Sequence, residues 1–119
     1  MDFKLSNEQK LIRDSAREFA QNELLPGVIE RDENKTFPKE QIAKMSEMGF
    51  LGMMTDPKYG GGGMDTVSYV LAMEEISKID ASCSVIMSVN NSLVCWGIEK
   101  YGSEKQKEKY LPELAQGNM

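Results

Sequence analysis

The stretch that most constrains the fold is DASCSVIMSVNNSLVCWGIEKYG, residues 80–102. Drawn as a helix, it is apolar on most sides, and it is unusually rich in Ser, Cys, Asn and Gly. We expect such a helix to be central and closely packed. Because its neighbours are amphipathic and the chain has only 119 residues, we also expect part of its cover to come from a partner surface.

Helical periodicity and capping residues predict further helices on both sides of this stretch. The first expected helix is 6–22, with a Ser6–Gln9 capping box, and a second piece after Pro26 and Gly27 reaches toward Asp32. A third helix runs from Pro38 to a cap at Gly49, and two more cover 65–79 and 80–102. The last helix is capped by Ser103 and bends or ends at Pro112. The sequence therefore predicts one all-α domain, a small bundle of five to six helices without significant sheet.

Four consecutive glycines, Gly60 to Gly63, stand just before the predicted helix 65–79. A phosphate-binding P-loop needs Lys and Ser or Thr after its last glycine, whereas Met64 and Asp65 follow here. The dinucleotide pattern G-x-G-x-x-G also fails. The glycines are therefore interpreted as a turn, entered by the buried, extended segment FLGMMT.

Charge and hydropathy exclude several classes of partner. Fourteen basic and nineteen acidic residues give a net charge of −5, which argues against nucleic acid and anionic membranes. No apolar run approaches the roughly 18 residues of a membrane span, and the N-terminus is polar, so we expect a cytoplasmic chain that begins at its own Met1.

Few residues could carry chemistry. The chain has no histidine, which excludes Ser-His-Asp and Cys-His catalysis and histidine-based metal sites. Cys83 and Cys95 lie twelve residues apart on one predicted helix, too far to pair, so we expect buried, reduced thiols. Glu74 and Glu75 point about 100° apart on a helix and are expected on a solvated face. We therefore expect no catalytic residue, cofactor-binding residue or metal ligand in this chain.

Three segments together resemble one family. LSNEQKLIRDSAREFAQNELLP, MGFLGMMTDPKYGGGGMD and SVNNSLVCWGIEKYGSEKQKEKYLPELAQGNM look like the N-terminal helical domain of acyl-CoA dehydrogenases, most similar to the short-chain or butyryl-CoA type. The most specific parts are the YGG-x-GMD turn and the run from YG to LA-x-G. The resemblance covers residues 1–119 and implies that the family's flavin-binding β-domain and C-terminal helical domain, which carries the glutamate base, are absent from this chain.

The resemblance implies an enzyme that uses FAD to oxidise short-chain acyl-CoA to trans-2-enoyl-CoA in fatty acid β-oxidation, the proton going to the glutamate and the hydride to the flavin. It also implies an electron-transfer flavoprotein as partner and a homo-oligomer when the protein is complete. This chain alone is expected to bind no FAD and to be inactive. Its expected contribution is to the walls that exclude water from the site.

The helix corresponding to 80–102 lies along the acyl tail in similar proteins. The substrate-binding candidates are therefore Ile86, Val89, Asn90 and Leu93, spaced three and four apart on one helix. Plain core packing is the competing interpretation for the apolar three, and many relatives have His where Asn90 stands. By resemblance the glycine turn passes close to a neighbouring domain. A different class of function, a stand-alone helical interaction module with an apolar groove, stays open as the alternative.

Overall fold

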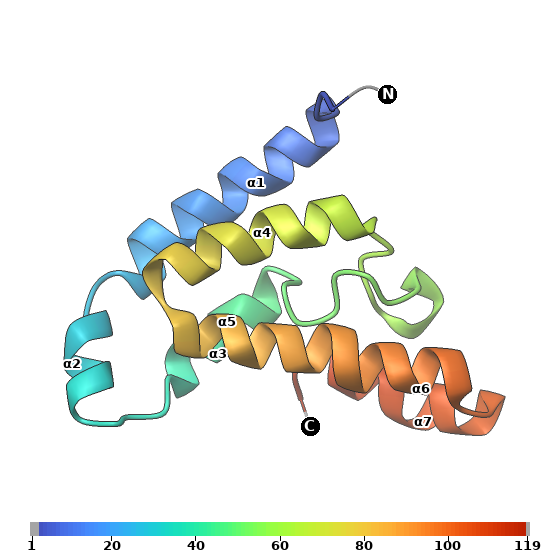
Figure 1. The fold of residues 1–119 in the computed structure, drawn as a ribbon. Coiled ribbons are helices and arrows are strands. Elements are labelled where there is room, and N and C mark those ends of the chain that lie inside the picture. Colours follow the sequence, from blue (N-terminus) through green and yellow to red (C-terminus); the bar gives the residue numbers. More distant parts are fainter. Residues whose placement is uncertain (1–2, 119) are drawn as a thin grey trace.

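The structure is a computed structural model that describes residues 3–118, and over this range it contains six continuous helices and no strand (Figure 1). They are α1 (Asn7–Phe19), extended by a π-helical turn (Ala20–Leu24); α2 (Val28–Glu33); α3 (Lys39–Glu47); α4 (Thr66–Ile79); α5 (Ala81–Ser88), which passes through a second π-helical turn (Val89–Cys95) into α6 (Trp96–Tyr101); and α7 (Glu104–Ala115). The predicted all-α fold is confirmed. A short 3₁₀ turn, Pro57–Tyr59, was not anticipated.

Side-chain caps fix the starts of α1 and α7 where the sequence places them. The Ser6 hydroxyl accepts a hydrogen bond from the Gln9 amide at 3.1 Å, and the Gln9 side chain accepts one from the Ser6 amide at 2.9 Å. Ser103 and Gln106 repeat this capping box at α7. Each box satisfies amide groups that an uncapped helix would leave without partners.

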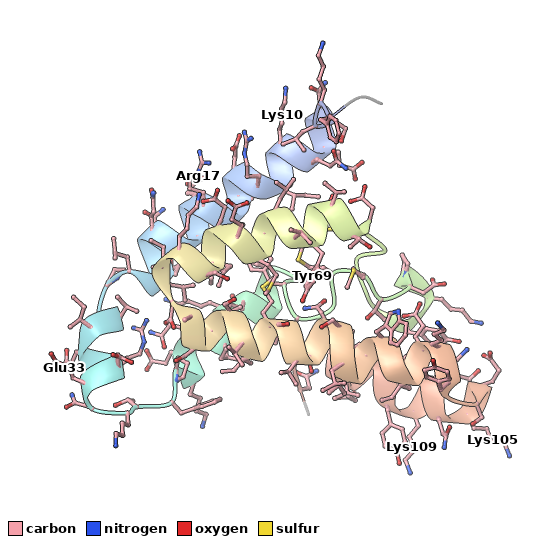
Figure 2. The ribbon with its side chains drawn as sticks, in the orientation of Figure 1. Lys10, Arg17, Glu33, Tyr69, Lys105 and Lys109 are labelled. Carbon is pink, nitrogen blue, oxygen red and sulfur yellow. The ribbon has the colours of Figure 1, made fainter. Side chains whose placement is uncertain are left out.

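The core lies where α1 packs on α4 and α4 packs on α5 (Figure 1). Tyr69 points from α4 toward the middle of the molecule (Figure 2). The buried members of this cluster are Ala16, Phe19, Ala20, Leu24, Met45, Phe50, Met53, Tyr69, Ala72, Ile76, Cys83 and Met87. We call the continuous helix formed by α5, the second π turn and α6 the long helix. A smaller cluster of Tyr59, Cys95 and Leu111 joins α7 to this long helix. The long helix is therefore held from the side of α4 and α7 and not all round.

The molecule is flat. Its Cα atoms extend over 42 × 39 × 19 Å, and the radius of gyration is 14.5 Å, against about 13.5 Å for a compact domain of this length. A helix with its side chains is about 10–12 Å across, so the slab is about two helices thick. A slab of this thickness cannot enclose any helix completely, which explains why the expectation of close packing around 80–102 is only partly met.

The helix Ala81–Tyr101 has 21 residues, and an 18-residue window within it has a mean hydropathy of 1.3, so by length and composition alone it could cross a membrane. The expectation that no apolar run approaches a membrane span is wrong for this helix. The serines and asparagines scattered through it lower the mean hydropathy, but the mean stays in the range of membrane-spanning helices. Core helices of globular domains meet the same criterion, and 28% of its apolar window is buried here.

Pro112 lies inside α7, and the helix continues to Ala115. The expectation that the helix could end at Pro112 is therefore wrong. Proline removes only one helical hydrogen bond, and the packing of Leu111 and Ala115, both buried, holds the last turn in place.

The glycine turn is confirmed as a turn. Gly60 and Gly63 have φ of +87° and +61°, in the left-handed region that favours glycine. Gly61 has a different reason, because a Cβ there would stand 2.1 Å from the Thr55 carbonyl oxygen. The amides of Gly62 and Met64 donate to carbonyls of residues 52 and 53 at 2.9 and 2.8 Å, so residues 61–64 lie alongside residues 52–55.

Candidate functional site

An uncovered apolar feature runs along α5 and the following π turn. Val85, Val89 and Leu93 have exposed fractions of 60%, 44% and 68%, and they succeed one another at intervals of four residues. We call these three residues the apolar row. Exposed apolar side chains that continue along one helix mark a surface built to be covered.

A groove of about 970 Å³ lies at the first turn of α5, between that helix and α2 with its following loop. Val85 and Ile86 lie on its α5 side, and exposed Ile29 and Phe37 lie opposite. The remaining lining residues are Val28, Arg31, Asp32, Glu33, Lys35, Thr36, Pro38, Ile79, Asp80, Ala81 and Ser82. Of the four substrate-binding candidates, Ile86 lines this groove, while Val89 and Leu93 lie farther along the same helix on the open surface.

The structure sets Asn90 apart from the other three candidates. Its amide nitrogen donates to the Leu51 carbonyl at 2.7 Å and to the Leu114 carbonyl at 2.9 Å. The side chain therefore points toward the loop before the glycine turn and toward α7, whereas Val89 and Leu93 point outward. Contact of any of the four residues with a substrate stays a prediction.

Asn91 is a residue that the sequence reasoning missed. It is 2% exposed, and its side-chain oxygen accepts from the Met53 amide at 2.7 Å. Its amide nitrogen donates to the carbonyls of Phe50 and Met87 at 2.7 and 2.9 Å. The available signal was an asparagine pair inside an otherwise apolar helix, since buried amides are costly unless they are hydrogen-bonded.

A second, smaller pocket of about 250 Å³ lies at the other end of the π turn. Its lining residues are Met54, Thr55, Asn91, Trp96, Glu99 and Lys100. The Lys100 ammonium stands 4.7 Å from the centre of the Trp96 ring, a cation–π contact at a half-exposed surface.

A buried ion pair fixes the wall between the groove and the core. Arg31 donates to Asp80 at 3.0 Å and to the Leu24 carbonyl at 2.8 Å, and both charged side chains are largely buried. Burial alone raises the pKa of Asp80, but the hydrogen bonds from Arg31 and from the Cys83 amide outweigh it, so this pKa is lowered. Asp80 is therefore an ionised cap for α5.

Both cysteines are buried and free. Burial raises the pKa of Cys83 to about 12, and the Asp80 carboxylate adds to that effect. Burial also raises the pKa of Cys95. Because the thiolate is the reactive form, neither sulfur is a nucleophile at neutral pH.

The expectation that Glu74 and Glu75 both face solvent is wrong for Glu75. Glu74 is exposed, whereas Glu75 is 5% exposed. Two nitrogens of Arg17 on α1 bind its carboxylate at 3.1 and 3.2 Å, and Lys78 adds a contact at 3.3 Å; Figure 2 shows Arg17 on α1. Glu75 thus ties α4 to α1.

Metal binding and phosphate binding can each be checked against the described residues. Among residues 3–118 no group of three or more His, Cys, Asp or Glu side chains could hold a metal ion. The amides of Gly61, Gly62 and Gly63 donate to carbonyls of Asp56, Gly52 and Thr55, which leaves this turn no free row of donors for a phosphate.

Comparison with known proteins decides the family. The sequence family described as acyl-CoA dehydrogenase, N-terminal domain, matches residues 6–118. The chain belongs to the acyl-CoA dehydrogenase family. Enzymes of this family are oxidoreductases and flavoproteins, and the fold described above is their N-terminal helical domain.

Individual relatives agree with this assignment. The short-chain-specific acyl-CoA dehydrogenase of Clostridium acetobutylicum is 45% identical over 98% of this chain and 31% of that protein. Butyryl-CoA dehydrogenase from Megasphaera elsdenii superposes with a TM-score of 0.90 at 38% identity, over 98% of this chain and 31% of that one. A chain in a structure of the electron transferring flavoprotein of Acidaminococcus fermentans superposes with a TM-score of 0.95 at 44% identity, over 99% of this chain and 31% of that one. The chain spans about 30% of the length of the curated relatives it matches.

Proposed function

We propose that residues 1–119 are the N-terminal domain of an FAD-dependent acyl-CoA dehydrogenase that oxidises short-chain acyl-CoA to trans-2-enoyl-CoA. In this proposal the domain supplies one wall of the acyl-chain pocket and part of the interface with the other domains. The observation that carries the proposal is the apolar row, exposed on a helix that the domain itself covers on one side only.

An acyl chain is a suitable occupant because the row is apolar and lacks charge. Apolar surface removed from water contributes about 25 cal/mol per Å², so a hydrocarbon tail against these side chains is stabilised without any polar contact. The row lies on a helix held from behind by α4 and α7, and a rigid wall of this kind holds a substrate in one position.

The flavin belongs elsewhere in this proposal. FAD supplies hydride transfer when bound, but the glycine turn of this chain has its amides engaged with its own carbonyls. The family's flavin-binding β-domain would hold the cofactor, and the helices described here would exclude water from it. The 119-residue chain alone is accordingly inactive.

Partners follow from the same proposal. The similarity to a chain in the structure of an electron transferring flavoprotein supports such a flavoprotein as electron acceptor. The complete enzyme is proposed to be a cytoplasmic homo-oligomer, with assembly contacts mostly in its C-terminal domain.

The test compares the 119-residue chain with the complete gene product. Each is mixed with FAD and butyryl-CoA, and bound flavin absorbance and dye reduction are measured. We expect flavin and activity only in the complete protein. Flavin binding or dye reduction by residues 1–119 alone would contradict the division of roles, and a complete product without butyryl-CoA oxidation would contradict the activity.

A further inference from the structure

The π turn changes the direction of the apolar row. In an α-helix, a step of four residues overshoots one full turn by about 40°, so three residues spaced by four drift about 80° around the helix. A π-helix has roughly 4.4 residues per turn, and the same step falls short of a full turn by about 30°. Val85 to Val89 is an α step and Val89 to Leu93 is a π step. With these ideal values the two deviations nearly cancel, and the three residues fall close to one line along the helix.

Two adjacent asparagines hold the π turn in place. Asn91 bonds the Met53 amide and the Phe50 carbonyl, and Asn90 bonds the Leu51 carbonyl. All three partners belong to the segment that precedes the glycine turn. Asn90 also reaches the Leu114 carbonyl at the end of α7, so the turn is fixed from two sides.

The bonds of Asn91 are made on the inner side of the helix, opposite the apolar row, and those of Asn90 on its flank. Asn91 is almost completely buried, and its three hydrogen bonds satisfy two donors and one acceptor. A π turn is rare and costs more than regular helix, so it persists where its surroundings hold it. The asparagine side chains bond this segment to residues 50, 51, 53 and 114.

We infer that Asn91, with Asn90, is a positioning residue that fixes the π turn and so determines acyl-length specificity through the alignment of Val85, Val89 and Leu93. This inference rests on the proposed function. Without the two amides the turn relaxes toward regular helix, and Leu93 rotates away from the line through Val85 and Val89. A wall that is no longer straight discriminates poorly between acyl chains of different length.

The test uses the complete enzyme with Asn91→Ala and, separately, Asn90→Ala. The control is Asn22→Ala, which changes an exposed asparagine in the other π turn. kcat and KM are measured with butyryl-, hexanoyl- and octanoyl-CoA, together with flavin content. We expect the ratio of kcat/KM for octanoyl-CoA to that for butyryl-CoA to change by at least about fivefold in both variants, with flavin content retained. The control leaves this ratio unchanged.

Two results would overturn the inference. The first is an unchanged ratio, including the case in which all three substrates lose activity by one common factor, because that is what a merely structural residue does. The second is loss of flavin from both variants, which would make the pair a requirement for folding. Val89→Leu separates this inference from the proposed function: a length profile that responds to Val89→Leu and not to the asparagines removes only the positioning role.

Discussion

At the scale of single residues, the consecutive glycines of the turn are required for different physical reasons. Gly60 and Gly63 need left-handed backbone, whereas Gly61 needs the absence of a side chain where two backbone segments touch. Apart from its chain neighbours and the backbone of its own helix, Gly97 in α6 has no atom within 4 Å of an added Cβ. The same substitution therefore has opposite consequences at Gly61 and Gly97.

We expect Gly61→Ala to lower the free energy of unfolding by about 2 kcal/mol or more, because the new methyl group meets the Thr55 backbone. Gly97→Ala, the matched control, is expected to raise it by about 0.5–1 kcal/mol through helix propensity. Urea unfolding followed by circular dichroism measures both. Equal effects of the two substitutions would show that the close approach at Gly61 is absent.

Glu75 gives the chain a specific dependence on pH. The hydrogen bond from Arg17 is the main reason that the pKa of Glu75 is lowered. A lowered pKa contributes stability that is present above the unfolded-state value of about 4.3 and is lost as the pH falls through the folded value. We expect Glu75→Gln to be less stable than the unmodified chain at pH 7 and the difference to shrink in acid.

Unfolding curves between pH 2 and pH 7 measure this difference. Glu74→Gln, at the exposed neighbour, serves as control and is expected to follow the unmodified chain throughout. A constant difference for Glu75→Gln over this range would mean that the Arg17 contact does not depend on the charge of Glu75.

At the scale of elements, the starts of the helices were predictable and their interruptions were not. Capping boxes are local patterns of four residues, so Ser6 and Ser103 identify helix starts directly. The π turn at 89–95 depends instead on carbonyls near residue 51 that reach Asn90 and Asn91 across about forty positions of sequence. Glu75 was misplaced for the same reason, since its partner Arg17 lies on another helix.

The candidate site was predictable in part. The family resemblance, together with helical spacing, selected Ile86, Val89, Asn90 and Leu93 as candidates, and the structure leaves Val89 and Leu93 exposed. Periodicity drawn for a regular α-helix could not show that Asn90 turns inward, because the side chain's direction is decided by the loop and by α7.

The junction of α4 and α5 depends on Asp80, which both caps α5 and pairs with buried Arg31. We expect Asp80→Ala to cost about 3–5 kcal/mol, because it leaves the Arg31 charge buried without a partner. Asp65→Ala removes the cap of α4 without such a pair and is expected to cost about 1 kcal/mol. Thermal unfolding compares the two, and similar losses would contradict the role assigned to the ion pair.

At the scale of the whole molecule, flatness is the decisive property. A slab 19 Å thick leaves the apolar row uncovered, so the 119-residue chain is expected to self-associate through this face. Sedimentation at several concentrations measures the association. Leu93→Lys is expected to weaken it, while Leu11→Lys, at an equally exposed leucine on α1, leaves it unchanged. Association that responds to Leu11 and not to Leu93 would place the contact on α1.

The account depends on the apolar row lying against the acyl chain. The most direct measurement is the acyl-length profile of the complete enzyme with Val89→Gly and with Val89→Leu. Since one methylene in an apolar pocket is worth about 1–3 kcal/mol, we expect Val89→Gly to admit longer acyl chains and Val89→Leu to penalise them. An identical length profile in both variants would place Val89 outside the pocket and contradict the proposed wall.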